Sequence, residues 1–283
     1  MQRERITDHV YVFTSSLYAQ VTAGLVVTDE GAVLIDTLAY PAETLQIKRF
    51  AEERLKTTIR YVINTHYHAD HTTGTCFFPN AQVIAHQRCR ELLNQRGRES
   101  LEQARNNSVE MRDVTLVQPD IVFDRSFTLH VGNKALQCWS TPGHSDDSIV
   151  CLVKEDQVLF AADTMMPIPH FVDGDHGALL ESLRGLRTQH FENIVQGHGE
   201  VILRGEVSEE IQSNIDYLIT LREAVDSALL SRSPQMRLDR IDVEDCGKSR
   251  ILLNGTVQIL HQQNVTVLAE QRRKALRLEY PYS

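Results

Sequence analysis

Residues 65–74 read Thr-His-Tyr-His-Ala-Asp-His-Thr-Thr-Gly and follow the apolar, strand-like run at 59–63. Four potential metal ligands therefore lie within six residues. On an extended chain His66 and His68 point to the same side. If the chain then turns into a helix, Asp70 and His71 can face a second point nearby. One ion cannot easily take four ligands from so short a loop, so the spacing predicts two adjacent metal ions.

Three further ligand-capable residues follow, each where a predicted strand ends or turns. His144 lies in Thr-Pro-Gly-His-Ser, Asp163 ends the apolar run 158–161, and His198 lies between two glycines. Sites built on a sheet usually use the loops at its strand ends. Each of the three residues is therefore a candidate for a site built on the sheet.

Together these motifs resemble the metallo-β-lactamase superfamily. The segment T-H-x-H-x-D-H-x-x-G is followed by P-G-H-S, a strand-ending aspartate and G-H-G, in that order, and the resemblance spans residues 6–205. It implies an α/β fold, a four-layer αββα sandwich with the metals at one edge between the two sheets. A C-terminal helical extension follows.

The resemblance also implies roles for individual residues. The implied ligands are His66, His68 and His144 for the first ion, Asp70, His71 and His198 for the second, and Asp163 as the bridge between both. Asp36 would orient a ligand histidine by accepting its free N–H. Many β-lactamases have cysteine or serine at the position of Asp163, whereas an aspartate there is similar to glyoxalase II and lactonases.

The expected cofactor is a pair of divalent metal ions. Zinc suits imidazole and carboxylate ligands, and iron or manganese suits them nearly as well. The expected reaction is hydrolysis of an ester-like bond, a thioester or a lactone, by a metal-bridged hydroxide. Asp70 is the candidate proton shuttle. A good leaving group fits the lack of a separate general acid.

Other activities of the same fold stay open. A mononuclear iron oxidoreductase similar to persulfide dioxygenases would use only His66, His144 and Asp163. A phosphodiesterase or nuclease, and a β-lactamase, are further alternatives. For the substrate pocket we expect contributions from Tyr67, which lies between two ligands, and from the apolar loop after Asp163, in particular Met166, His170 and Phe171.

Composition limits the possible partners. The 283 residues are 42% hydrophobic and 24% charged, as in ordinary globular domains, and the formal net charge is −9. An acidic chain argues against nucleic acid as a partner, and no apolar run approaches the length of a membrane span. Five cysteines without a C-x-x-C pair and a start without a signal peptide favour a cytoplasmic location. We expect a small-molecule substrate, no membrane partner and a possible homodimer.

Periodicity predicts how the chain is organised. Strand and helix signals alternate up to residue 96, a polar insertion covers 97–113, and residues 121–163 read as an antiparallel meander. Helices are predicted at 177–190, 206–230 and 247–276. The predicted domains are a catalytic domain at residues 1–205 and a helical cap at residues 206–283.

Overall fold

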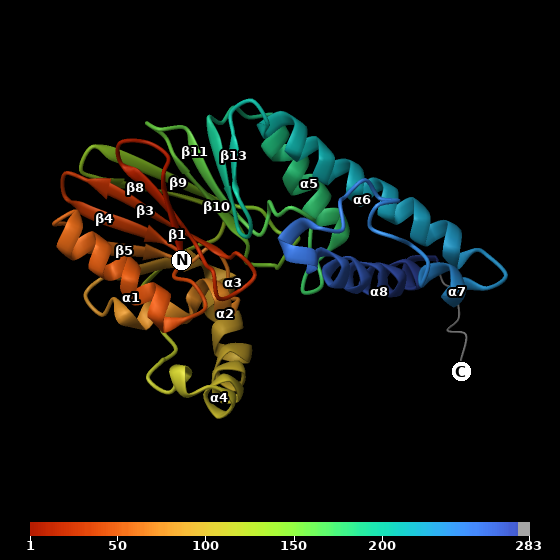
Figure 1. Cartoon of the computed structure of the whole chain (residues 1–283), viewed down its shortest axis with the longest axis horizontal. Coiled ribbons are helices and arrows are strands. Elements are labelled where there is room, and N and C mark those ends of the chain that lie inside the picture. The colour runs from red at the N-terminus through yellow and green to blue at the C-terminus, as the bar shows by residue number, and fades with distance from the viewer. Residues whose placement is uncertain (277–283) are drawn as a thin grey trace.

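Two β-sheets stack face to face in the computed structural model, which describes residues 1–276 (Figure 1). One hydrophobic core lies between the two sheets. A second core lies between the first sheet and the helix on its outer face, and a third lies between the second sheet and its helices. This is the predicted αββα sandwich with C-terminal helices. The layers arise because each sheet is apolar on both faces and must cover both.

The first sheet combines antiparallel and parallel pairing. Strands β1 to β4 are antiparallel, and β4 to β7 are parallel. Its strands, in spatial order, are β1 (Gln2–Arg5), β2 (Val10–Thr14), β3 (Thr22–Thr28), β4 (Gly31–Ile35), β5 (Ile59–Ile63), β6 (Gln82–His86) and β7 (Ile121–Phe123).

The second sheet runs antiparallel from β8 to β11, and β11 then pairs in parallel with β12. Its strands are β8 (Ser126–Val131), β9 (Lys134–Ser140), β10 (Ile149–Val153), β11 (Val158–Ala162), β12 (Asn193–Gln196) and β13 (Val201–Leu203). The predicted meander at 121–163 is wrong at its start, because β7 pairs with β6 in the first sheet. A two-residue period shows a strand but not the sheet it joins.

The core between the sheets brings the two backbones close. A Cβ on Gly24 of β3 would lie 2.0 Å from the Phe160 ring of β11. Glycine at this position therefore makes room for the aromatic side chain that fills the space between the sheets.

Helices cover the outer faces of the sheets, and both α4 and the C-terminal helices project from the sandwich (Figure 1). The helices are α1 (Pro41–Arg49), α2 (Ala69–Thr72), α3 (Gln87–Leu92), α4 (Arg98–Asn107), α5 (His176–Arg187), α6 (Val207–Leu229), α7 (Pro234–Leu238) and α8 (Val257–Leu276). Short 3₁₀ segments lie at Thr73–Phe77, Val109–Met111 and Leu252–Gly255, and π-helical turns lie at Phe50–Arg54 and Leu93–Gly97. The segment of α4 projects from the sandwich as the predicted polar insertion (Figure 1).

The C-terminal helices extend outward from the second sheet: α6 packs along α5, and α8 packs along α6 (Figure 1). Buried residues of α5, α6 and α8 form one hydrophobic core with that sheet. The helix predicted at 247–276 begins only at Val257, because Leu253, Asn254 and Gly255 have positive φ angles that interrupt helical geometry. The division at residue 205 stays a prediction, and residues 277–283 of the predicted cap lie outside the described part. Within residues 1–276, every helix falls short of the length and apolarity that a membrane span requires.

Candidate metal centre

The candidate metal centre lies at one edge of the sandwich, where strands of both sheets end. Asp36 follows β4, residues 64–71 follow β5, Asp163 follows β11 and His198 follows β12. The strands of each of these two pairs are parallel, so their carboxyl ends meet at the same edge. His144 joins them from the loop between β9 and β10. The topology thus gathers residues that are far apart in the chain.

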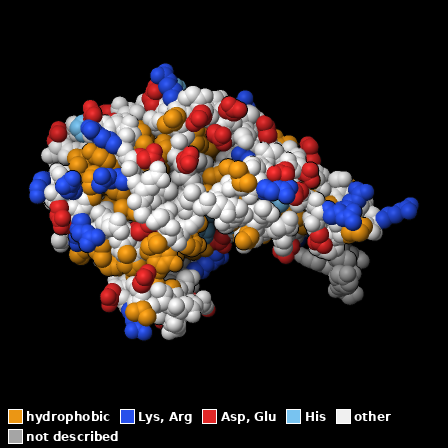
Figure 2. Space-filling model, in the orientation of Figure 1, with side chains coloured by type: hydrophobic (Ala, Val, Ile, Leu, Met, Phe, Trp, Pro, Cys, Tyr) orange, Lys and Arg blue, Asp and Glu red, His pale blue; other side chains and the backbone are white. Residues whose placement is uncertain are grey.

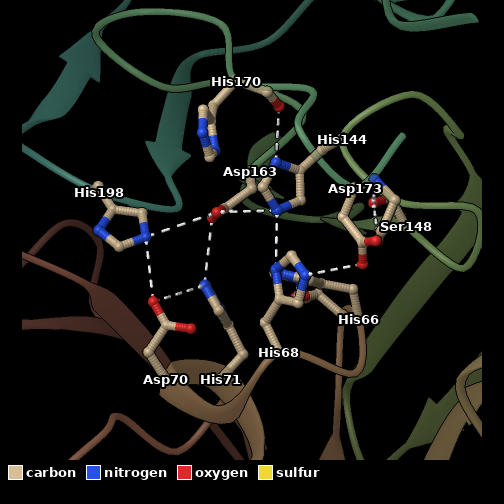
Figure 3. A network of polar contacts seen from close by, with 12 residues as sticks. His66, His68, Asp70, His71, His144, Ser148, Asp163, His170, Asp173 and His198 are labelled. Carbon is tan, nitrogen blue, oxygen red and sulfur yellow. Dashed lines mark hydrogen bonds and ion pairs between the residues drawn. The ribbon is translucent and has the colours of Figure 1, made fainter. Parts of the chain in front are cut away.

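The structure brings all seven predicted ligand residues together. Their donor atoms form three overlapping groups, and within each group the atoms lie within 4.8 Å of one another. The groups are His66, His68 and His144; His66, His71 and Asp163; and Asp70, His71 and His198. Figure 3 shows these side chains pointing toward a common space, with the Asp163 carboxylate between the two sides.

Three imidazole nitrogens face one another on one side of this space. His68 Nδ1 lies 3.0 Å from His66 Nε2 and 3.0 Å from His144 Nε2. A tetrahedral zinc ion with Zn–N bonds of about 2.0–2.1 Å would separate its nitrogens by roughly 3.3 Å. The three nitrogens are therefore spaced as ligands of one cation would be.

The outer nitrogen of each imidazole has an acceptor of its own. The outer contacts are His66 Nδ1 to Thr65 Oγ1 (3.2 Å), His68 Nε2 to Asp173 Oδ2 (3.3 Å), His71 Nδ1 to Asp36 Oδ2 (2.8 Å), His144 Nδ1 to the His170 carbonyl (2.7 Å) and His198 Nδ1 to the Ala19 carbonyl (2.8 Å). A histidine that donates its outer N–H presents a lone pair on its inner nitrogen. All five imidazoles are thus arranged to offer a lone pair to the centre.

Asp36, at the end of β4, contacts the histidine loop that follows β5. Its carboxylate accepts hydrogen bonds from the Thr65 backbone N–H at 2.8 Å and from Thr65 Oγ1 at 2.7 Å, besides the one from His71. The residue has a positive φ of 57°, which is uncommon outside glycine and asparagine. The tight turn after β4 therefore aims this carboxylate at the histidine loop.

The two carboxylates of the centre lie beside His71 and His198. His71 Nε2 is 3.2 Å from Asp163 Oδ1, and His198 Nε2 is 3.3 Å from Asp70 Oδ2 and 3.5 Å from Asp163 Oδ2. His71 Nε2 and Asp163 Oδ1 are buried, and although they lie 3.2 Å apart neither makes a hydrogen bond. Buried polar atoms without partners are costly in a finished fold. A bound cation at this point would satisfy both, so the residues present fit a metal ion.

The charges of the centre shift the pKa values in two directions. Burial lowers the pKa of His144 to about 3, since the charged form loses its hydration. Burial also disfavours protonation of His198, but Asp163 and Asp70 outweigh it and raise the His198 pKa to about 10. Burial thus favours the neutral form of His144, whereas Asp163 and Asp70 favour positive charge beside them, on His198 or on a bound cation.

Close packing around Asp163 depends on a glycine. A Cβ on Gly197, immediately before His198, would lie 1.8 Å from Asp163 Oδ1. The residue before Asp163, Ala162, has a positive φ of 44° at the end of β11. The G-H-G motif therefore lets the loop of His198 pass directly beside the Asp163 carboxylate.

Sequence patterns did not predict Asp173 as part of the site. Its carboxylate contacts His68, accepts a hydrogen bond from the Tyr67 hydroxyl, and receives one from Arg96 Nη1 at 2.6 Å. Burial and the bond to Asp173 raise the pKa of Tyr67 to about 12. Asp173 lies in a loop without a metal-binding motif, so only the fold brings it to His68.

A second residue missed from the sequence is Asn264 of α8. Its side chain donates to the Pro169 carbonyl at 2.7 Å and accepts from the Phe171 N–H at 3.3 Å. Between these two residues lies His170, whose carbonyl holds His144. The C-terminal helices thus brace the loop that orients one side of the centre.

The residues predicted to line the substrate pocket separate into two sets. Tyr67 lines a cavity of about 350 Å³ that reaches His68 and Asp70. Met166 and Phe171 are instead buried in the body of the protein, and Phe171 belongs to the core formed with α5, α6 and α8. The His170 ring contacts Gln263 at 3.1 Å and does not line that cavity.

Comparison with known proteins agrees with this architecture. The model of the metallo-beta-lactamase superfamily matches residues 18–198. The lactamase-like protein nscB of Trichophyton equinum is 26% identical over 239 residues, which are 84% of this chain and 63% of that protein. The atrochrysone carboxyl ACP thioesterase of Claviceps purpurea is 25% identical over 231 residues, 81% of this chain and 66% of that protein. The chain thus spans slightly less than two thirds of the length of both relatives.

A solved structure shares the fold over nearly the whole chain. The metallo-beta-lactamase family protein TTHA1429 of Thermus thermophilus aligns with a TM-score of 0.71 and 16% identity, covering 96% of this chain and 95% of its own. The family model spans well over half of the chain, and the stacked sheets and the histidine–aspartate cluster agree with it. The chain therefore belongs to the metallo-beta-lactamase superfamily.

Proposed function

We propose that the protein is a metal-dependent hydrolase of ester-like bonds, thioesters or lactones, with two divalent ions, zinc, in the centre. One observation carries the proposal. Five imidazoles, each held from outside by its own acceptor, and two carboxylates direct their free atoms to one space. Such a donor set is typical of a site that keeps metal for catalysis rather than for folding.

In this proposal His66, His68 and His144 hold the first ion, Asp70, His71 and His198 hold the second, and Asp163 contacts both. When bound, the two ions supply a water molecule whose pKa is lowered from 15.7 to about 7 and polarise the substrate carbonyl. Asp36 and Asp173 keep His71 and His68 in the required orientation.

Asp70 is the residue that we propose to move the proton. It lines the cavity, and its Oδ2 lies beside His198 Nε2. A carboxylate at this place can accept a proton from the attacking water and return it to the departing group. A thiolate or the alkoxide of a lactone requires little help from a strong acid, which agrees with the proposed substrates.

The relatives support the same reaction class. One of them is named as a thioesterase. An aspartate at position 163 also distinguishes this centre from the cysteine or serine found in many β-lactamases. We therefore propose thioester cleavage in preference to β-lactam cleavage.

Elemental analysis of the purified protein, followed by assays with thioesters, lactones, β-lactams and a phosphodiester, tests the proposal. We expect about two zinc ions per chain, hydrolysis of a thioester or a lactone, and loss of that activity on chelation with recovery on adding zinc. One iron per chain with oxygen uptake would instead favour the dioxygenase alternative. Turnover restricted to phosphodiesters or β-lactams would also contradict the proposal.

A further inference from the structure

The cavity beside the centre extends away from the metal ligands toward the projecting insertion. Residues 67–70 line its end at the centre, and residues between Leu93 and Val117 line the side toward the insertion. The remaining lining residues come from the body of the protein: Tyr18, Ala39, Tyr40, Thr72 and Thr73. Its volume of about 350 Å³ lies within the range of small-molecule sites. Figure 2 shows hydrophobic side chains gathered where the projecting insertion meets the body. The cavity therefore continues the reaction site beneath the insertion.

The wall contributed by the insertion is apolar. It consists mainly of the side chains of Leu93, Leu101, Ala104, Val114, Leu116 and Val117. Leu101 and Ala104 lie one turn apart on the same side of α4, although no residue of α4 is buried. A helix that covers no core and turns its apolar side to a cavity is suited to contact a ligand.

Among the described residues, those lining the cavity offer no free cation. Arg96 is the one lysine or arginine of that lining, and it donates to Asp173 Oδ1 at 2.6 Å and to the Tyr67 hydroxyl at 2.9 Å. Its charge is thereby paired within the protein. Beneath the insertion, away from the proposed metal ions, a carboxylate or phosphate would have no counter-charge, whereas a hydrocarbon chain needs none.

The segment that joins α3 to α4 borders this cavity. The π-helical turn Leu93–Gly97 joins α3 to α4 and brings Leu93 and Arg96 to the cavity. A Cβ on Gly97 would lie 3.0 Å from Leu116 Cδ1, so the leucine packs against bare backbone. Arg105 of α4 donates to the Val114 carbonyl and ties the helix to the loop that closes the cavity. π-Turns of this kind are frequent at functional sites.

We infer that this cavity binds the uncharged, apolar acyl chain of the substrate, with the scissile carbonyl at Asp70 and the chain beneath α4. The inference rests on the proposed hydrolase function and narrows it to thioesters of aliphatic acids. Selectivity for the acyl group then resides in the insertion, and the metal ligands take no part in it.

A chain-length series tests the inference. The substrates are S-acyl-N-acetylcysteamine thioesters from acetyl to decanoyl, which share one leaving group. For the zinc-loaded wild type, kcat/KM should rise about fourfold with each added methylene until the cavity is full. Ala104→Leu places three more carbon atoms in the cavity and should reduce the decanoyl-to-acetyl ratio at least about tenfold.

The matched control is Asn106→Leu, which adds a leucine at an exposed position of the same helix. It should keep the wild-type ratio. A flat series for the wild type, or equal ratios for the two variants, would overturn the inference while thioester hydrolysis itself still stood.

A binding measurement tests the apolar cavity independently of any hydrolysis. The probes are S-alkyl-N-acetylcysteamine thioethers of the same lengths, which cannot be hydrolysed. Measured by calorimetry, their Kd should fall about fourfold per methylene for the wild type and Asn106→Leu, and the longest probes should bind Ala104→Leu at least about tenfold more weakly. A Kd independent of length would refute the apolar cavity whichever substrates are turned over.

Discussion

The strand-end wall, which carries the candidate metal ligands, and the insertion wall of the neighbouring cavity are built in contrasting ways. On the strand-end wall, the metal-ligand candidates His66, His71 and Asp163 are buried almost completely, and the outer imidazole nitrogens have acceptors from the body. On the insertion wall, α4 buries no residue and is tied to the following loop by Arg105. The side chains of the strand-end wall are fixed by burial and by hydrogen bonds, whereas α4 has no buried residue to fix it.

This difference teaches how the molecule separates reaction from selectivity. Groups that act on a reacting bond need positions precise to a fraction of an ångström, which packed strand ends and outer hydrogen bonds supply. A wall that only covers hydrocarbon needs shape but not exact angles. Changes to the strand-end wall should therefore affect metal content and turnover, and changes to the insertion should affect the substrate range.

The strongest test of the strand-end wall is Asp163→Ala. The substitution removes the carboxylate that faces both groups of donors and that lies beside the inner nitrogens of His71 and His198. We expect turnover of an acetyl thioester to fall by at least about 10³-fold together with the metal content. Metal analysis and kinetics on the same preparation measure both. The exposed Asp8→Ala serves as the control, and full activity in Asp163→Ala would refute the shared centre.

A comparison of two orienting carboxylates sharpens the contrast. Asp36 is buried and holds His71 at 2.8 Å, whereas Asp173 is half-buried, holds His68 at 3.3 Å and is shared with Arg96 from the insertion side. Asp36→Asn should weaken zinc affinity about 10–100-fold, as is usual for carboxylates behind metal-bound histidines.

Asp173→Asn should weaken zinc affinity less than about tenfold, because its contact to His68 is longer and more solvated. Titration with a competing chelator gives both affinities. An equal loss in the two variants would show that the strand-end wall does not depend on the more deeply buried carboxylate.

The smallest expected effect concerns stability. Leu101 of α4 is half-buried at the cavity, whereas Leu34 of β4 is fully buried in the core of the first sheet. Leu101→Ala should lower the free energy of unfolding by about 1 kcal/mol. Leu34→Ala should lower it by about 2–5 kcal/mol. Denaturant titration of the metal-free proteins compares them, and similar losses would mean that the insertion is part of the core.

Much of the fold could be predicted from local patterns. The strand β5 and the long helix α6 each have a clear pattern and lie close to their predicted bounds, 59–63 and 206–230. The misassigned β7 and the late start of α8 have other causes. Pairing of β7 with β6 is a contact across the whole insertion, and three successive positive φ angles leave little trace in the apolar pattern.

For the site, too, the sequence predicted some residues and missed others. Histidine and aspartate at the strand ends have an unusual spacing, so the donor set was visible in the sequence. The apolar loop after Asp163 was a misleading signal, because Phe171 uses its ring to fill the core. Asp173 and Asn264 carry no motif, and each acts on a residue that is distant in the chain.

By itself, the sequence determined the family, the strand-ending positions of the candidate ligands and the acidic, globular character of the chain. These properties depend on residue type and short spacing, which can be read locally. Only the tertiary structure decided which atom of each imidazole faces inward, which loops hold it, and that an apolar cavity opens under α4. Orientation and empty space arise from contacts between segments tens of residues apart, and such contacts leave no period in the sequence.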